Sequence, residues 1–201
     1  MSHSLQGEIA LVTGASRGIG AAIADELAAL GATVIGTATS DAGAKAIGDR
    51  LAPHGGHGRV LNVTDSGAVD ALVDAIGKEF GAISILVNNA GITRRNGITA
   101  DPDASAKDWH DVTSINLDGP FNVTQAFLEP LRAAKGRIIN IASIQSFVHL
   151  RTPTTPAYTA SKHGVLGFTR ALAAELGKDG VRVNAIGPGF IETPLNAATR
   201  A

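Results

Sequence analysis

Tyr158 and Lys162, four residues apart, carry the strongest chemical signal in the sequence, and Tyr158 is its only tyrosine. The surrounding residues have helical spacing, so both side chains are expected on one face of a helix. A phenol with a pKa of about 10 exchanges protons poorly at neutral pH, but a neighbouring ammonium favours the phenolate. The pair therefore predicts proton transfer to or from an alcohol oxygen. A tyrosine and a lysine on a helix surface, with no catalytic role, would show the same spacing.

A glycine-rich segment near the N-terminus points to a ligand that carries phosphate. Residues 13–20 contain Gly14, Gly18 and Gly20, follow a short apolar run and open a helical pattern. Glycines let the backbone turn tightly and approach a pyrophosphate, and the N–H groups of the following helix attract its charge. A tight turn without a ligand is the alternative, but the strand before it and the helix after it favour a dinucleotide site.

The end of the second expected strand indicates which dinucleotide would bind. An acidic residue there usually holds the ribose 2′-hydroxyl of NAD. Residues 36–40 contain no carboxylate, whereas Arg17 lies inside the glycine loop and Thr39 offers a hydroxyl. Such groups suit a 2′-phosphate, so we expect NADP(H), with Arg17 and Thr39 near the extra phosphate. Asp41 blurs this preference, and a solvated Arg17 is the alternative.

These residues must be positioned by an alternation of strands and helices. Apolar runs of strand length occur at residues 9–13, 33–35, 60–63, 83–88, 137–142 and 181–186. Alanine-rich stretches with helical spacing separate them. This alternation predicts an α/β fold in which helices cover both faces of a parallel sheet, within a single domain over residues 1–201. Ser105 is expected to cap a helix, and Trp109 to open one as a packing anchor.

Composition excludes several classes of function. The chain has 201 residues, 44% of them hydrophobic, and Lys and Arg total 17 against 18 Asp and Glu. A disordered chain is excluded, and the net charge of −1 gives no electrostatic reason to expect nucleic acid or a membrane as a partner. No cysteine is present, and the six histidines lack metal-binding spacing, so we expect no metal. Without a signal peptide or an apolar span, we expect a soluble cytoplasmic protein.

Several further motifs complete a pattern along nearly the whole chain. Thr13-Gly14-x-x-x-Gly18-x-Gly20, Asn88-Asn89-Ala90-Gly91, Asn116, Ser143, Tyr158-x-x-x-Lys162 and Asn184-x-x-Gly187-Pro188-Gly189 occur in this order. In this combination the sequence resembles the short-chain dehydrogenase/reductase family. The resemblance implies a Rossmann-type doubly wound sheet and hydride transfer between a nicotinamide and a carbonyl/alcohol pair.

The resemblance also assigns roles to residues. It makes Tyr158 the general acid/base, Ser143 the hydroxyl that positions the substrate oxygen, and Lys162 a ribose ligand that lowers the pKa of Tyr158. Asn116 would hold a water in a proton relay. The residues implied to bind the cofactor are Gly14, Ser16, Arg17, Gly18, Ile19, Gly20, Thr39, Asn62, Val63, Asp65, Asn88, Ala90, Gly91, Tyr158, Lys162, Pro188, Gly189, Ile191 and Thr193.

Pro120 gives the Asn116 assignment a local mechanism. Pro120 stands four residues after Asn116 in the same expected helix. Because proline has no N–H, it leaves the Asn116 carbonyl free to accept a hydrogen bond from water. We expect Pro120 to shape the site in this way; a helix kink without a chemical role is equally compatible with the sequence.

The substrate is less clearly indicated than the cofactor. Residues 7–94 most resemble 3-oxoacyl-acyl-carrier-protein reductases, which implies a small carbonyl substrate, possibly bound to acyl carrier protein. Residues 138–147 and 158–162 instead resemble sugar-acid dehydrogenases, so a sugar-acid or polyol dehydrogenase is an alternative.

The C-terminal end and the oligomeric state give two further expectations. Members of the family continue into another helix and a seventh strand, which this sequence does not contain. Residues 181–186 are then expected to form an unpaired edge, and a catalytically impaired, cofactor-binding scaffold is a further alternative. The resemblance also implies a homodimer or homotetramer formed through two long helices at residues 107–134 and 157–177.

Overall fold

A parallel sheet of six strands forms the centre of the computed structural model, which describes residues 4–148 and 156–193. The strands lie in the order β3-β2-β1-β4-β5-β6, and each neighbouring pair is parallel. They are β1 (Ile9–Val12), β2 (Thr33–Ala38), β3 (His57–Val60), β4 (Ile85–Asn88), β5 (Arg137–Ile141) and β6 (Arg182–Ile186). The strand order reverses between β1 and β4, so this is the expected Rossmann-type doubly wound sheet.

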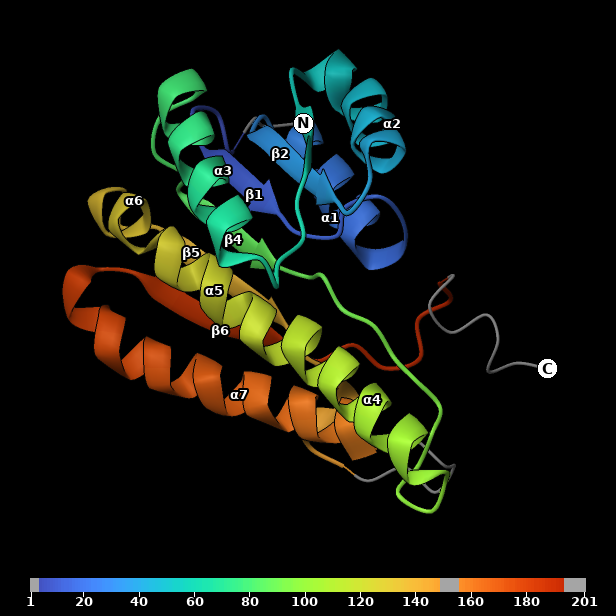
Figure 1. Cartoon of the computed structure of the whole chain (residues 1–201). Coiled ribbons are helices and arrows are strands. Elements are labelled where there is room, and N and C mark those ends of the chain that lie inside the picture. The colour runs from blue at the N-terminus through green and yellow to red at the C-terminus, as the bar shows by residue number, and fades with distance from the viewer. Residues whose placement is uncertain (1–3, 149–155, 194–201) are drawn as a thin grey trace.

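Helices cover the two faces of this sheet (Figure 1). They are α1 (Gly18–Ala29), α2 (Asp41–Leu51), α3 (Ser66–Glu79), α4 (Pro102–Thr113), α5 (Gly119–Ala126), α6 (Leu128–Ala133) and α7 (Pro156–Leu176). Side chains of α1 and α2 pack with Val12 and Val34 on one face. Side chains of α3, α5 and α7 pack with Leu11 and Ile35 on the other. Successive side chains of β1 and β2 point to opposite faces of the sheet, so each strand contributes to both hydrophobic cores.

Side-chain caps set where three of the helices begin. Ser40 accepts a hydrogen bond from the Gly43 N–H at the start of α2, and Asp65 accepts one from the Ala68 N–H at the start of α3. The cap of α4 is Asp101, which accepts from the Ala104 N–H. The expectation that Ser105 caps this helix is therefore wrong, because Asp101 followed by Pro102 at the first helical position is the stronger start.

The third strand lies earlier in the chain than expected. It spans His57–Val60, paired with Ile35–Ala38 of β2, instead of residues 60–63. Leu61 and Val63 are buried, but they follow the strand and pack into the core from the turn. The apolar pattern identified burial correctly, whereas backbone pairing at this sheet edge involves polar and glycine residues.

The first of the two expected long helices is interrupted. A π-helical turn (Ser114–Asp118) separates α4 from α5, and Phe127 separates α5 from α6. In the π turn the Gly119 N–H reaches the Ser114 carbonyl, just before Pro120. Trp109 lies within α4 and is 44% exposed, so the expectation that it opens a helix and anchors packing is wrong. The second long helix forms as α7.

The outer side of β6 is the most exposed part of the sheet. Among residues 4–148 and 156–193 no strand pairs with this edge, and Ile186 is 53% exposed. No helix in those same two segments is long and apolar enough to cross a bilayer.

Candidate active site

The glycine loop between β1 and α1 is closely packed against the end of β4. Gly14 adopts φ +66°, a conformation that side chains rarely adopt. A Cβ on Gly20 would collide with the Gly14 carbonyl and with the Asn89 amide. The Asn89 side chain donates to the Thr13 and Gly14 carbonyls, each at 3.0 Å. Only glycine therefore fits at position 20, and the loop is held in one shape.

Thr13 joins the carboxyl ends of the two central strands. Its buried hydroxyl oxygen accepts hydrogen bonds from the N–H groups of Asn89 and Ala90, both at 3.0 Å. This places Asn88, Ala90 and the neighbouring glycine loop at the point where the strand order reverses. Ligands of doubly wound sheets bind at this point.

The two groups expected near a 2′-phosphate lie on separate segments, Arg17 in the loop between β1 and α1 and Thr39 directly after β2. Ser16, Arg17 and Thr39 are all exposed to solvent, and Arg17 directly precedes α1. Arg50 of α2, which was not predicted, donates to the Ala15 carbonyl at 2.7 Å and pairs with Asp25 of α1. Arg50 thus ties both helices to the glycine loop, a long-range contact that no local motif signals.

The residues expected near an adenine have structural partners of their own. The Asn62 carboxamide oxygen accepts from the N–H and the hydroxyl of Thr64. Asp65 caps α3, and the Val63 carbonyl accepts from the Asn122 amide at 3.0 Å. Asn62 and Asp65 nevertheless remain exposed, on the turn that follows β3.

Ser143, Tyr158 and Lys162 lie together where β5 ends and α7 begins. The Tyr158 phenol forms a side-chain hydrogen bond with Ser143, whose hydroxyl oxygen also accepts from the Gln145 N–H at 3.1 Å. The Lys162 Nζ lies 5.7 Å from the centroid of the Tyr158 ring and donates to the Ile141 carbonyl at 2.7 Å. The phenol and the amine therefore face the same small region.

Burial controls the charge of both groups. Desolvation raises the pKa of Tyr158 above its ordinary value, and the Ser143 hydrogen bond partly opposes this. Desolvation also lowers the pKa of Lys162 to about 8. The sequence led us to expect a lowered phenol pKa; without a bound cofactor the net shift is the opposite, because loss of water outweighs the hydrogen bond with Ser143.

The Asn116 side chain is fully occupied inside the protein. Its oxygen accepts from the Ile92 N–H at 2.8 Å, and its nitrogen donates to the Ile92 carbonyl at 2.9 Å and to the Ser161 hydroxyl at 3.2 Å. Asn116 lies in the π-helical turn, and π turns often occur at functional sites. These bonds hold the segment after Gly91 against the start of α7.

The Asn184–Gly189 motif packs behind the Ser143 turn. The Pro188 carbonyl accepts from the Ile144 N–H at 2.9 Å, and the Ile186 carbonyl accepts from the Ala142 N–H. Gly189 and Ile191 are exposed and Thr193 is half-buried. Pro188 therefore lies against the turn that follows Ser143, at the carboxyl edge of the sheet.

Two buried polar residues at this site were not predicted. Ser146 hydrogen-bonds to the backbone of both Ser143 and Lys162. Asn140 accepts from the Asn88 amide at 2.8 Å and donates to Thr169 at 2.9 Å. The capping-box spacing of Ser143 and Ser146 could have identified the first. In the described part of the chain no cluster of His, Asp and Glu could hold a metal ion.

The glycine loop at the strand-order reversal, together with the buried Ser143 hydroxyl and Lys162 amine and the half-buried Tyr158 phenol, defines a dinucleotide-binding oxidoreductase. The family model described as "short chain dehydrogenase" matches residues 8–201. The chain therefore belongs to the short-chain dehydrogenase/reductase family, whose members use a nicotinamide cofactor. The close packing at Gly14 and Gly20, where a Cβ would strike protein atoms, keeps the loop and the start of α1 tightly turned, and this fits the glycine pattern of a site for such a cofactor.

Two groups of relatives are similar to the chain. It is 45% identical over 196 residues to the 3-oxoacyl-[acyl-carrier-protein] reductase FabG of Escherichia coli K12, covering 97% of this chain and 78% of the relative. The FabG of Vibrio harveyi is 47% identical over the same shares. A crystal structure of a gluconate 5-dehydrogenase from Burkholderia cenocepacia, with NADP and tartrate, superposes with a TM-score of 0.88 at 38% identity, covering 98% of this chain and 76% of that one.

Proposed function

We propose that the chain, acting as one domain, reduces a carbonyl to an alcohol with NADPH, with a 3-oxoacyl thioester as substrate. The observation that carries the proposal is the grouping of the Ser143 hydroxyl with the Tyr158 phenol, with the Lys162 Nζ 5.7 Å from the centroid of the phenol ring. A phenol that burial keeps protonated is ready to donate its proton to an oxygen.

The proposed chemistry uses the three side chains in distinct ways. The Ser143 hydroxyl donates a hydrogen bond to the substrate oxygen and so fixes the carbonyl beside the phenol. Tyr158 transfers its proton to that oxygen as negative charge develops there. Lys162, which bonds to the Ile141 carbonyl when no cofactor is bound, is placed to hold the cofactor ribose and to stabilise the phenolate that forms. The nicotinamide, when bound, supplies the hydride.

Asn116 and Pro120 support a route for returning the proton. The Asn116 side chain is committed to Ile92 and Ser161, so the proposed role falls on its backbone carbonyl. Pro120 cannot donate to that carbonyl. We assign the carbonyl to a water that relays a proton from solvent towards Lys162. A Pro120→Ala variant should change the pH–rate profile; an unchanged profile would remove Pro120 from the relay.

Preference for NADP(H) is proposed from the cations at the glycine loop and from the lack of a carboxylate at residues 36–40. Arg17 in the glycine loop and Thr39 after β2 are exposed, and Arg50 adds a cation beside the loop. The gluconate 5-dehydrogenase that resembles the chain was crystallised with NADP. The KM for NADPH should be lower than that for NADH, and Arg17→Ala should narrow the difference. A clear preference of the wild-type enzyme for NADH would contradict the proposal.

The remaining cofactor contacts follow the family pattern. We propose that the glycine loop binds the diphosphate, that the turn after β3 lines the adenine, and that the segment after β6 borders the nicotinamide. The residues assigned to these contacts are Gly14, Ser16, Gly18, Ile19, Gly20, Asn62, Val63, Asp65, Asn88, Ala90, Gly91, Pro188, Gly189, Ile191 and Thr193.

A sugar-acid dehydrogenase is the second candidate function. It is favoured by the likeness to gluconate 5-dehydrogenases, whereas the FabG relatives favour acyl thioesters. Nicotinamide absorbance would be followed with acetoacetyl-CoA and then with keto-sugar acids. Faster turnover of acetoacetyl-CoA supports the first function and faster turnover of a sugar acid supports the second. Saturable cofactor binding without turnover of either supports a scaffold.

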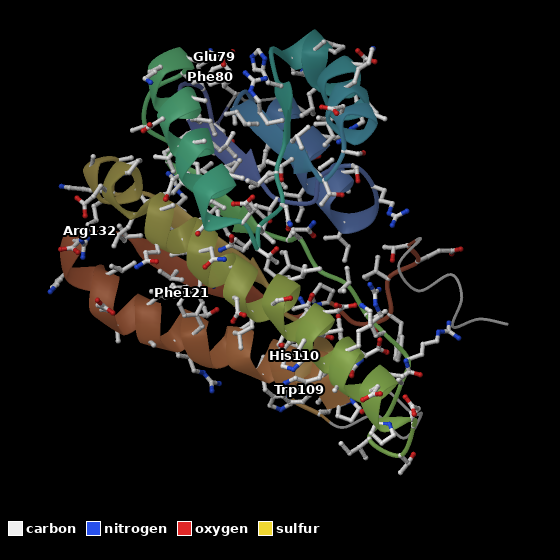
Figure 2. All side chains as sticks on the ribbon, viewed as in Figure 1. Glu79, Phe80, Trp109, His110, Phe121 and Arg132 are labelled. Atoms are coloured by element: carbon white, nitrogen blue, oxygen red, sulfur yellow. The ribbon has the colours of Figure 1, made fainter. Side chains whose placement is uncertain are left out.

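We propose a homodimer or homotetramer in the cytoplasm, built through the layer of α4, α5 and α7. Trp109 and Phe121 lie along this layer (Figure 2), with exposed fractions of 44% and 49%. The ring centroids of Phe121 in α5 and Phe168 in α7 are 6.3 Å apart, so an aromatic strip crosses these two helices. Exposed apolar strips of this kind favour association. Sedimentation should detect a dimer or a tetramer; a monomer at micromolar concentration would contradict the proposal.

A further inference from the structure

Ser146 links two catalytic segments through one buried hydroxyl. Its oxygen accepts a hydrogen bond from the Ser143 N–H at 3.3 Å, and its O–H donates to the Lys162 carbonyl at 2.6 Å. Only 3% of Ser146 is exposed. The hydroxyl therefore joins the turn that carries Ser143 to the helical turn of α7 that carries Lys162.

The turn has a second polar connection to α7. The Thr159 hydroxyl donates to the Gln145 carboxamide oxygen at 2.9 Å. Ser146 and Gln145 thus reach α7 at two residues that follow Tyr158, namely Lys162 and Thr159. Unlike the aliphatic cores, this junction depends on directional bonds, which fix an orientation as well as a distance.

We propose that Ser146 is a positioning residue that holds the Ser143 hydroxyl at the phenol of Tyr158. The inference rests on the proposed acid/base role of Tyr158, and it assigns Ser146 no contact with substrate or cofactor. The 3₁₀ turn Ile144–Ser146 has three residues, and such short turns have poor hydrogen-bond geometry of their own. The hydrogen bond from the Ser146 hydroxyl to the Lys162 carbonyl anchors this turn to α7.

Loss of the Ser146 hydroxyl should change the pKa of the Tyr158 phenol, because it would displace Ser143. The Ser143 N–H and the Lys162 carbonyl would both lose a buried partner, so the turn would shift relative to α7. The Ser143 hydrogen bond lowers the pKa of Tyr158, and a longer bond would lower it less. Among residues 4–148 and 156–193, Lys162 is the cation that faces the phenol ring, and the turn itself, Ile-Gln-Ser, adds no charge.

The test compares Ser146→Ala with Thr169→Val. Thr169 is a similar buried hydroxyl of α7, which donates to the Val165 carbonyl at 2.8 Å and accepts from the Asn140 amide. Both variants should lose stability. Only Ser146→Ala should lower kcat, by about tenfold, and raise the apparent pKa of the acid/base group by about half a unit.

A direct titration separates this inference from the proposed function. Because Tyr158 is the only tyrosine, near-ultraviolet phenolate absorbance reports its pKa without any turnover. A higher titration midpoint in Ser146→Ala than in both wild type and Thr169→Val supports the inference, even if the wild type reduces no substrate tested. An unchanged midpoint overturns it, even if the enzyme is active.

A second variant covers the case in which Ser146→Ala does not fold. Ser146→Cys keeps a side chain of similar shape but replaces the hydroxyl by a weak hydrogen-bonding group. Its phenol midpoint should also rise, and a midpoint equal to that of the wild type overturns the positioning role.

Discussion

The two halves of the sheet differ in how the residues at their carboxyl edge are held in place. In the half built from β1, β2 and α1–α3, the buried polar side chains among the described residues are Thr13 and Thr37, and the loop is shaped by Gly14 and Gly20. In the half from β4 to α7, many more polar side chains are buried. They are Asn88, Asp108, Asn116, Thr124, Asn140, Ser143, Ser146, Ser161, Lys162 and Thr169.

This difference follows from what each half is proposed to bind. A diphosphate is held by backbone N–H groups, which need close approach and therefore the absence of side chains. Proton transfer needs a few groups held at fixed distances in a dry site, which side-chain hydrogen bonds provide. Substitutions in the glycine loop of the first half should therefore affect cofactor binding, and those next to Ser143 and Tyr158 in the second half should affect rate and pH dependence.

The largest expected effect is that of Tyr158→Phe. Loss of the proton donor should lower kcat by about 10²–10⁴-fold. The phenol makes one side-chain hydrogen bond, to Ser143, so the melting temperature and the cofactor Kd should change little. Steady-state kinetics with a fluorescence titration of NADPH would measure both. Activity within tenfold of wild type would exclude Tyr158 as the acid/base.

Lys162→Met tests the charge buried in the catalytic half. The pKa of Lys162 is about 8 in the folded protein against 10.5 ordinarily, so between these values the unfolded chain binds the extra proton. The free energy of unfolding of the wild type should therefore rise with pH over this range, by roughly 3 kcal/mol from this group.

Lys162→Met should lack that rise. Urea unfolding across the same pH range would compare the two proteins, and the variant's stability relative to wild type should be greatest below pH 8. Parallel curves for the two proteins would show that the buried amine is not the source of the pH dependence.

Gly20→Ala tests the glycine loop of the first half. The new Cβ would strike the Gly14 carbonyl and the Asn89 amide, at a cost of about 1–3 kcal/mol. The cofactor Kd should rise at least tenfold. Gly77→Ala in α3 is the matched control, since nothing lies within 4 Å of its Cβ position. The control should bind cofactor normally and gain up to about 1 kcal/mol of stability; equal effects in the two variants would refute the packing argument.

The smallest effect is expected for Lys45→Ala on the surface of α2. The ion pair of Lys45 with Asp49 is exposed, with side-chain accessibilities of 75% and 66%. Its loss should change stability by no more than about 0.5 kcal/mol and leave NADPH binding unchanged. A weaker NADPH affinity in this variant would mean that long-range charge, rather than the loop's shape, controls binding in this half.

Sequence alone identified the features that depend on local spacing. The glycine loop and the Tyr158–Lys162 pair each lie within a few residues of chain, and the strand–helix alternation gave the fold. The boundary of β3 was missed because Leu61 and Val63 are buried without being in the strand. The bonds from Ser146 to Lys162 and from Arg50 to Ala15 join distant residues, and the net direction of the Tyr158 pKa depends on burial. Such features depend on how distant parts of the chain come together in the folded protein.

One titration tests most directly whether Tyr158 exchanges the proton. The phenolate absorbance of this sole tyrosine would be recorded against pH in the cofactor-saturated enzyme, beside the pH dependence of kcat. The account predicts one common midpoint, which moves upward in both measurements when Ser143 is replaced by Ala. A rate profile that follows a group with a different midpoint, or a phenol midpoint unaffected by Ser143→Ala, would contradict the account.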